Sequence, residues 1–403
     1  MDHGSGSVRN VRVLDAQGRF GPPTDVVWRD GRFAEGTDRS TAGDDGTRLE
    51  RTGLDGTALW LIPGLIDAHT HASWHAFHSE DRAAIPEHET RELTRASLHA
   101  MLLRGTTSIR DAGGLTPAEA ARLGAEGAPL PRVRTSVLMI DRTAADAAGG
   151  VEHAVEAALG EGAEWIKLVG TAGVASPPGS RLEPTFSPSE TAAAVREAAQ
   201  GGARVMVHAW GGPIIDSAIE AGAASIEHGI FLTAEQAARA AERNVVFVPT
   251  LRIYTQVQQM IARGELPEAF AARVAEAVTA HPGAVRLARD AGVRIALGSD
   301  SGTPEQHRTA LREFSALIAA GLAPEEALLA ATRGGAELLA GVDRASSSPS
   351  DYPSGRIAPG EVADAVLLKV DPLEPAHHAA IGDPSAVSAV VLGGEVVHPP
   401  AAA

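Results

Sequence analysis

The stretch LIPGLIDAHTH, residues 61–71, starts as an apolar run and ends in polar side chains. Similar short runs follow it, separated by segments rich in Ala, Leu, Glu and Arg that have helical character. Strands that alternate with helices are typical of an α/β protein, and eight such strands predict a (β/α)8 TIM-like barrel with a closed parallel sheet. The eight predicted strands are 61–67, 107–110, 133–140, 165–169, 205–207, 224–226, 245–248 and 293–297.

Three segments between these runs have strong helical patterns, at 89–103, 188–199 and 323–331. Ser187-Pro188 and Ala323-Pro324 mark two helix starts, because proline is favoured in the first turn. A doubly wound open sheet also alternates strands and helices, and it is the competing architecture. No G-x-G-x-x-G turn follows any strand, which argues against nucleotide binding.

Both ends of the chain differ from the middle, because they contain short β-rich runs and turn signals such as Asp44-Asp45-Gly46 and Gly393-Gly394. Neither end has enough strands to be stable alone, so we expect 8–60 and 356–397 to pair in one sheet beside the barrel. The predicted domains are a small composite β-sandwich built from both termini, 1–60 plus 356–403, and a barrel over 61–345. The Ser- and Pro-rich segment 345–353 is the predicted linker between them.

Composition excludes several classes of function. The formal net charge of −16 disfavours nucleic acid and anionic membranes as partners. The absence of cysteine removes disulfides, thiolate zinc sites and cysteine nucleophiles, so any metal must be held by nitrogen and oxygen donors. No signal peptide and no apolar run of about 18 residues is found, and we expect a cytoplasmic protein. The predicted partner is a small-molecule substrate, and homo-oligomer formation is left open.

Polar residues stand at the ends of several predicted strands, where a parallel barrel carries its active site. His69 and His71 are two residues apart, so both can point to one face of the first strand. Lys167 lies within an apolar strand, where an ammonium is costly to bury unless it is paired or modified. Each of these residues alone has an ordinary structural explanation. Together they predict a site for zinc, iron or manganese at one mouth of the barrel. The other candidate ligands are His208, His228 and Asp300.

The motif at 61–71 resembles the signature of the amidohydrolase superfamily. The whole chain resembles its imidazolonepropionase-like branch, which includes metal-dependent Xaa-Pro dipeptidases and ochratoxin-cleaving amidases. The resemblance implies a metal-dependent hydrolase that cleaves a carbon–nitrogen bond outside ordinary protein substrates. The matching segments continue, in order, with TTSIRDAGG (106–114), WIKLVGTAGVASP (165–177), VMVHA (205–209), SIEHG (225–229), VPTL (248–251), IALGSD (295–300) and GRIAPGEVADAVLL (355–368).

The resemblance also implies a role for each ligand. His69 and His71 would hold the more buried ion with Asp300, and His208 and His228 would hold a second ion. Lys167 sits where binuclear members carry a carbamylated lysine that bridges both ions. We therefore expect two divalent ions, zinc foremost, with a single ion as the alternative. Asp300 would accept a proton from the attacking water and pass it to the leaving nitrogen, and His228 is the next candidate base.

Arg252 and Tyr254, just beyond the seventh run, are candidates for binding a substrate carboxylate or carbonyl, with helix-start packing as the alternative. Asp111 is expected to be structural and to pair with Arg110. His75 and His78 are expected on a loop rather than in the pocket, and His307 has no assigned role. The loop 170–188 is placed to cover the site. Relatives often carry a Thr-Gly-Gly-His-like segment at 140–143, and here it is Ile140-Asp141-Arg142-Thr143. The resemblance therefore does not extend to that part of a dipeptidase pocket.

Three functions compete at this point. The first is a binuclear amidase or peptidase that acts on a small molecule. The second is a mononuclear deaminase or cyclic-amidine (imidazolone-type) hydrolase, in which Lys167 would bind substrate rather than metal. The third is a non-enzymatic scaffold with the same fold. Metal content distinguishes them, because they require near two, near one and near zero ions per chain.

Overall fold

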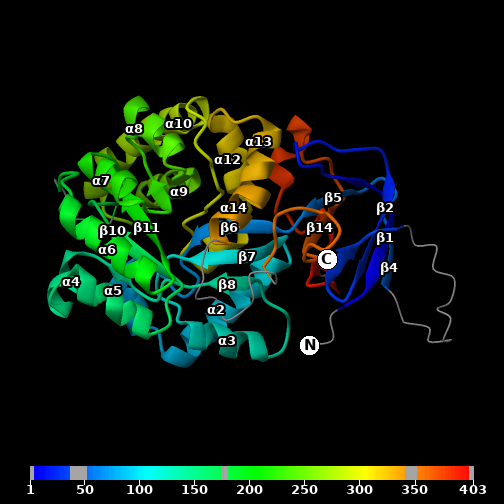
Figure 1. Ribbon diagram of the computed structural model, residues 1–403, viewed down its shortest axis with the longest axis horizontal. Helices are drawn as coiled ribbons and strands as arrows, with labels where there is room; N and C mark the ends of the chain where they lie inside the picture. The colour runs from blue at the N-terminus through cyan, green and yellow to red at the C-terminus, as the bar shows by residue number, and fades with distance from the viewer. Residues whose placement is uncertain (1–3, 37–51, 175, 177–179, 341–351, 399–403) are drawn as a thin grey trace.

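Two parallel sheets occupy the centre of the molecule, and a larger mixed sheet built from both chain ends lies beside them (Figure 1). The computed structural model describes residues 4–36, 52–174, 176, 180–340 and 352–398. Within that part, no helix is long and apolar enough to cross a membrane.

The parallel sheets confirm an α/β fold with parallel strands. One contains β6 (Leu65–Thr70), β7 (Thr106–Asp111) and β8 (Arg132–Arg134). All neighbours within each sheet run parallel, as the alternating sequence pattern predicts. The second sheet has, in order, β13 (Val246–Val248), β12 (Ser225–His228), β11 (Arg204–Ala209), β10 (Trp165–Val169) and β9 (Met139–Ile140).

The segment 294–297 links the two sheets without forming an extended strand. The amide of Phe247 in β13 donates to the carbonyl of Arg294 at 2.9 Å, and the amide of Ala68 in β6 donates to the carbonyl of Leu297 at 2.8 Å. The segment therefore lies between β13 and β6, at the place of the eighth predicted strand. A closed eight-stranded barrel stays a prediction.

Two predicted strands are divided. The run 133–140 is split into β8 and β9, because Val137 adopts a left-handed backbone with φ 65° that an extended strand does not allow. The run 61–67 is split at Gly64, where the chain passes from one sheet to the other. A Cβ at Gly64 would lie 2.1 Å from the Thr107 hydroxyl oxygen, so this crossing requires glycine.

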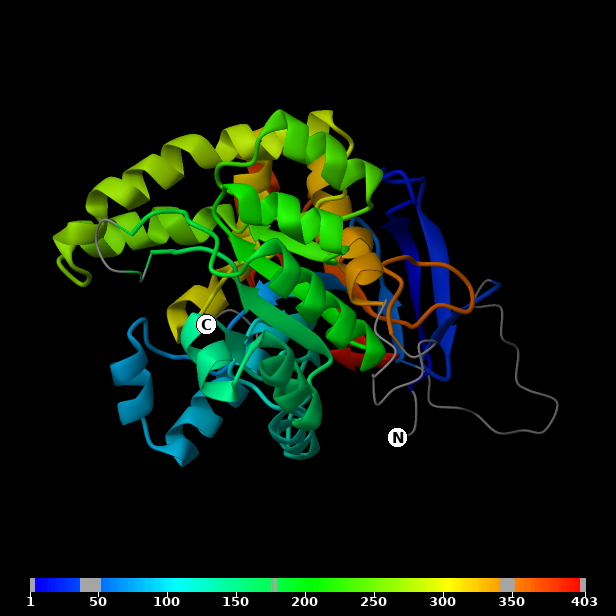
Figure 2. The ribbon, with the colours of Figure 1, turned by 60° about the vertical axis from the view of Figure 1, so that its left-hand side comes forward.

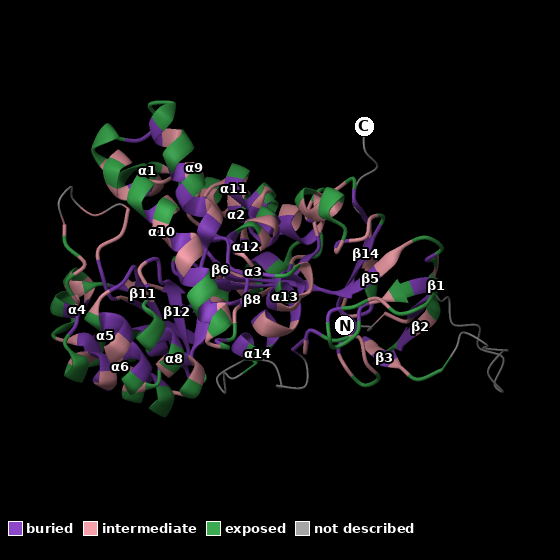
Figure 3. Ribbon diagram, turned by 90° about the horizontal axis from the view of Figure 1, so that it is seen from above, coloured by how far each residue is buried: buried purple, intermediate pink, exposed green. Residues whose placement is uncertain are grey.

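Helices cover the outside of the parallel strands, and Figure 3 shows their exposed faces turned outward from the buried strands. The predicted helices at 89–103 and 188–199 are confirmed as α2 and α6, and a reciprocal Ser187–Glu190 cap starts α6. The segment 323–331 begins α13 and continues through a π-helical turn, Ala330–Gly334, into α14. The helices are α1 (Ser79–Ala84), α2 (Glu87–Leu102), α3 (Pro117–Ala125), α4 (Arg142–Ala148), α5 (Val151–Gly160), α6 (Pro188–Gln200), α7 (Pro213–Ala221), α8 (Ala234–Glu242), α9 (Leu251–Ala262), α10 (Ala271–Asp290), α11 (Pro304–Arg308), α12 (Glu313–Ala320), α13 (Pro324–Leu329) and α14 (Gly335–Leu339), with 3-10 turns η1 (Glu268–Phe270), η2 (Ala310–Arg312) and η5 (Pro375–Ala380).

We call the mixed sheet the terminal sheet. Its central strand β5 (Trp60–Pro63) pairs in parallel with β1 (Gly6–Val13) and antiparallel with β14 (Ala365–Leu368). The predicted pairing of the two chain ends in one sheet is therefore confirmed. Figure 2 shows this sheet on the side of the molecule opposite to α9 and α10. The remaining strands are β2 (Thr24–Arg29), β3 (Arg32–Ala34), β4 (Thr52–Asp55), β15 (Val387–Leu392) and β16 (Glu395–Val397).

A small apolar core and several long-range hydrogen bonds hold the terminal sheet together. Val8 and Leu61 from the N-terminal part are buried against Leu367 and Val391 from the C-terminal part. The indole nitrogen of Trp28 donates to the carbonyl of Gly394 at 2.8 Å. A β-sandwich arrangement and the domain boundaries stay predictions. The predicted turn at 44–46 and most of the linker 345–353 lie outside the described residues.

Candidate metal centre

The first predicted ligand set meets at the carboxyl ends of the parallel strands. His69 lies in β6, His71 follows that strand directly, and Asp300 follows the 294–297 segment. One Asp300 oxygen is 3.3 Å from His71 Nε2 and 3.5 Å from His69 Nε2. One donor atom from each of the three residues lies within 4.8 Å of the other two, a spacing that one metal ion can draw together.

The remaining predicted ligands join the same cluster from β10, β11 and β12. The Lys167 amine nitrogen is 3.0 Å from His69 Nε2. The ring centres of His208 and His228 are 4.5 Å apart, and His228 Nδ1 is 4.0 Å from the second oxygen of Asp300. The structure therefore brings together all the side chains that the sequence nominated as ligands.

Hydrogen bonds at Nδ1 orient three of the imidazoles. His69 Nδ1 is 2.5 Å from a carboxylate oxygen of Glu227, and His71 Nδ1 is 3.3 Å from the carbonyl oxygen of Gly113. His228 Nδ1 is 2.7 Å from the Thr250 hydroxyl. Each of these contacts uses Nδ1, so Nε2 remains the nitrogen that can bind a metal ion. A histidine that ligates a metal through one ring nitrogen is commonly oriented by a hydrogen bond at the other.

His208 gives the clearest sign that the donor set fits a metal ion. Its Nε2 is buried and has no hydrogen-bond partner among the described residues, which is costly for a polar atom in a closed site. Gly173, on the loop after β10, covers this ring so closely that a Cβ there would lie 3.1 Å from Nε2. Four imidazoles and one carboxylate are donors that zinc-type ions accept.

Burial sets the charge states of the cluster. It lowers the pKa of His69 to about 4 and that of His208 to about 3, so both imidazoles stay neutral and able to ligate. It also lowers the pKa of Lys167 to about 8, which brings the neutral amine within reach. Burial alone would raise the pKa of Asp300, but a hydrogen bond from His71 and nearby positive charge outweigh it and lower the pKa to about 2.

Three residues with strained backbone conformations lie at the carboxyl ends of the parallel strands, beside the ligand cluster. His228, Thr250 and Asp300 have φ values of 71°, 54° and 52°, in the left-handed region that few side chains adopt. Each such residue costs on the order of 1–3 kcal/mol, and such residues concentrate at functional sites. The three residues follow neighbouring parallel elements, so the strain lies where these elements turn toward the ligand cluster.

The sequence analysis missed a buried ion pair beneath the ligands. Arg110 donates to both carboxylate oxygens of Glu227, at 2.9 and 3.0 Å, and both side chains are fully buried. The predicted pairing of Arg110 with Asp111 is wrong, because neighbouring residues in a strand point to opposite faces. Asp111 is structural, and it accepts hydrogen bonds from the backbone amides of Ala72, Gly113 and Leu115. The sequence signal that could have indicated this ion pair is Glu227, an acidic residue within an apolar strand, directly before His228.

Glu227→Gln should lower the free energy of unfolding by about 3–5 kcal/mol, because it leaves the Arg110 charge buried without its partner. Urea denaturation followed by tryptophan fluorescence measures this change. Glu220→Gln is the control, since Glu220 is 52% exposed where it pairs with Arg243, and it should cost less than about 1 kcal/mol. Equal losses in the two variants would contradict the prediction.

The two predicted substrate-binding residues, Tyr254 and Arg252, differ in their positions. Tyr254 is buried with its ring centre 6.1 Å from that of His228, so it lies beside the cluster. The Arg252 guanidinium instead donates to the backbone and hydroxyl oxygens of Thr309 at 2.9 and 3.0 Å, which agrees with the packing alternative. In the 140–143 segment, Asp141 caps α4.

The additional histidines lie around the cluster rather than among its closest atoms. His75 Nε2 is 2.9 Å from the Thr94 hydroxyl, and the ring centre of buried His307 is 6.5 Å from that of His75. His78 precedes α1. Trp74 stacks on His71 with 3.7 Å between ring centres, so this loop does contact a predicted ligand.

Comparisons with known proteins identify the family of the chain. The model of the amidohydrolase family matches residues 60–397. The ochratoxinase of Aspergillus niger is 29% identical over 379 residues, which cover 84% of this chain and 76% of that protein. An uncharacterised protein of Mycobacterium tuberculosis is 32% identical over 282 residues, which cover 68% of this chain and 72% of that protein.

Solved structures show the same likeness over nearly the whole chain. A prolidase crystallised with N-methylphosphonate-L-proline has a TM-score of 0.86 at 27% identity, and the match covers 98% of this chain and 99% of that one. The structure of the Aspergillus niger ochratoxinase has a TM-score of 0.83 at 23% identity, and the match covers 100% of this chain and 98% of that one. At that identity the second likeness concerns the fold alone.

Proposed function

The chain belongs to the amidohydrolase family, and from that premise we propose that it is a metal-dependent hydrolase that cleaves an amide or peptide-like bond of a small molecule. The prolidase and ochratoxinase relatives support hydrolysis of such bonds. The observation that carries the proposal is the meeting of His69, His71 and Asp300, with the orphaned Nε2 of His208 in the same cluster. A closed (β/α)8 barrel that holds these residues at its mouth is part of the proposal.

The proposed cofactor is a pair of divalent ions, zinc foremost. His69, His71 and Asp300 would hold one ion, and His208 and His228 the other, with a carbamylated Lys167 between them. Such ions lower the pKa of a bound water toward about 7 and polarise the carbonyl that the water attacks.

Asp300 is proposed to move the proton. Its low pKa keeps the carboxylate charged at neutral pH, so it can accept a proton from the attacking water and deliver it to the leaving nitrogen. The Asp300 side chain is 20% exposed, whereas that of His69 is fully buried, so the carboxylate is the more accessible of the two to substrate. His228 is the second candidate base, although its contact with Thr250 also suits a purely ligating role.

A mononuclear deaminase or cyclic-amidine hydrolase is the second candidate function. It is supported by the tight grouping of donor atoms from His69, His71 and Asp300, which forms a single three-residue site in the described part of the chain. In this version Lys167, with its amine 3.0 Å from His69 Nε2, would bind substrate beside one ion.

Removal of metal should abolish activity. We expect a metal-replete preparation to hydrolyse members of a panel of Xaa-Pro dipeptides and N-acyl amino acids, and a strong chelator to stop the reaction. Zinc or manganese added to the dialysed protein should restore it, because the proposal assigns water activation to the bound ions. Elemental analysis before and after dialysis counts the ions, with near two expected per chain. Full turnover by protein shown to be metal-free would contradict the proposed mechanism.

The remaining proposals concern the binding partners, the cellular location and the oligomeric state of the protein. We also propose a small-molecule substrate, no nucleic-acid or membrane partner and a cytoplasmic location, which the charge and composition of the chain support. Homo-oligomer formation is compatible with the proposal and is not required by it.

A further inference from the structure

A cavity of about 250 Å³ is lined by none of the predicted ligands. It is lined by the second residue after the end of α2, by the end of α11 with η2, and by the loop 381–384 that precedes β15. The helices α2 and α11 pack against each other at this place. Three arginines line the cavity, namely Arg104, Arg308 and Arg312, together with the carboxylate of Asp383.

The cavity carries excess positive charge in a strongly acidic chain. Three guanidinium groups face one carboxylate, whereas the whole chain has a formal net charge of −16. Burial and the nearby charge of Arg308 lower the pKa of Arg104, which indicates that the two like charges are held close together. Asp383 accepts hydrogen bonds from the backbone amide and the hydroxyl of Ser385 at 2.8 and 2.7 Å, so much of its capacity is already used.

The arginines of the cavity also keep donors unused. Arg104 donates through Nη1 to the carbonyl of Ala100 at 2.8 Å, but its Nε is buried without a partner in the described part of the chain. Arg308 and Arg312 are exposed, and their side chains make no ion pair or hydrogen bond with any described residue. Leaving the buried Nε of Arg104 unpaired is costly, so this nitrogen favours an acceptor that enters from outside.

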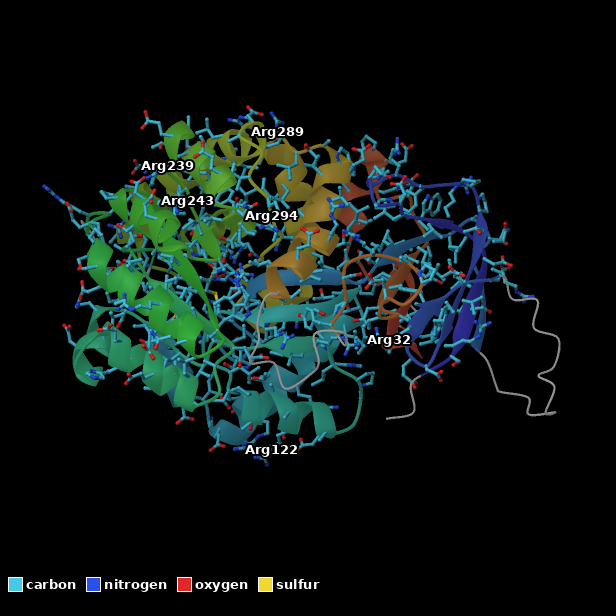
Figure 4. All side chains as sticks on the ribbon, in the orientation of Figure 1. Arg32, Arg122, Arg239, Arg243, Arg289 and Arg294 are labelled. Atoms are coloured by element: carbon cyan, nitrogen blue, oxygen red, sulfur yellow. The ribbon has the colours of Figure 1, made fainter. Side chains whose placement is uncertain are left out.

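Some arginines elsewhere on the surface are paired. Several of those labelled in Figure 4 pair with a carboxylate on their own or a neighbouring helix, and Arg122, Arg239 and Arg243 are examples. Arg308 and Arg312 differ from these three, because neither forms an ion pair with a described residue, and both line the same cavity.

We propose that this cavity binds a small organic phosphate, whose phosphate group is held by Arg104, Arg308 and Arg312. Guanidinium groups match phosphate oxygens with paired hydrogen bonds, which is why arginine is common at phosphate sites. Leu311 and Ile381 line the same cavity and contact the carbon part of the ligand. Asp383 accepts a hydrogen bond from a hydroxyl group of the ligand. The volume lies below the range of about 300–1,000 Å³ that is usual for ligand sites, so the ligand is small.

Isothermal titration of the metal-replete protein with glycerol 3-phosphate tests the proposal, with glycerol and malonate as comparison ligands. We expect glycerol 3-phosphate to bind, glycerol to give no heat, and malonate to bind more weakly. The double variant Arg308→Ala/Arg312→Ala should bind at least about tenfold more weakly, the effect expected for losing a charge-assisted hydrogen bond. Arg308→Lys should retain part of the affinity, because it keeps the charge and loses the paired geometry.

The matched control is Arg239→Ala/Arg243→Ala, which removes one arginine of α8 and the arginine that directly follows this helix and should leave binding unchanged. Because the cavity shares no residue with the predicted ligand set, loss of binding in the first double variant cannot come from phosphate on the metal ions. Equal binding in wild type and both double variants would overturn the proposal, as would preference for malonate. A dimer that dissociates in Arg308→Ala/Arg312→Ala, with no phosphate binding, would also overturn it and assign the arginines to a second copy of the chain.

Discussion

Asp300→Asn should lower kcat by at least about 10²-fold while the metal content stays near that of the wild type. The asparagine oxygen can still ligate an ion weakly, but an amide cannot accept a proton at neutral pH. In the wild type, hydrogen bonding to His71 and nearby positive charge outweigh burial and keep the pKa of Asp300 at about 2, so the carboxylate is ionised at neutral pH. Steady-state kinetics and elemental analysis of the same preparation measure the two quantities separately.

Asp67→Asn is the control for this variant. Asp67 is buried two residues from His69, but its carboxylate is occupied by the Ser299 hydroxyl and backbone amide, and burial raises its pKa to about 6. Its loss should lower kcat much less than the loss of Asp300. An Asp300→Asn enzyme within a few-fold of the wild type would mean that another group is the base, and His228 would then be tested next.

Lys167→Ala should remove at least one ion per chain and most of the activity. A lysine carbamate forms when a neutral amine adds to carbon dioxide and releases a proton, and burial lowers the pKa of Lys167 to about 8, which makes that amine accessible. The proposed carbamate would supply a carboxylate-like ligand on Lys167, whose amine lies 3.0 Å from His69 Nε2. Acetate or propionate should therefore restore part of the metal content and part of the activity in the variant.

The sequence offers a well-matched control, because it contains only two lysines. Lys369→Ala removes the exposed one and should change neither metal content nor activity. If Lys167→Ala instead keeps its metal and only raises KM, the lysine binds substrate and the mononuclear function is favoured. Two bound ions in wild-type protein with an unmodified Lys167 turned away from both would defeat the binuclear version.

Regular patterns allowed much of the fold and the ligand cluster to be predicted. His69 and His71 were identified because a strand turns every second side chain to one face, and Asp300 because it follows an apolar run. Features that depend on three-dimensional contacts were not predictable in this way. Arg110 pairs with Glu227 rather than Asp111 because the two strands face each other across the interior. Arg252 turns to Thr309 because a carbonyl of a distant segment lies within reach.

Local backbone conformation limited the prediction of strands. The run 133–140 is apolar enough for one strand, but the left-handed backbone of Val137 divides it. The eighth run, 293–297, makes hydrogen bonds on both sides but forms only an isolated bridge at Ile295 rather than a continuous strand. Neither outcome is encoded in hydrophobic periodicity, because both are imposed by the neighbouring elements.

The terminal sheet has a consequence for how the chain folds during its synthesis. Leu61 pairs with Leu367, so one edge of β5 has no partner until nearly the whole protein has left the ribosome. Contacts between residues so far apart in the sequence slow folding. Until β14 is available, the unpaired edge of β5 exposes backbone groups that can form hydrogen bonds with another chain. Translation therefore sets the order of events: the parallel sheets can assemble as they emerge, whereas the terminal sheet closes last.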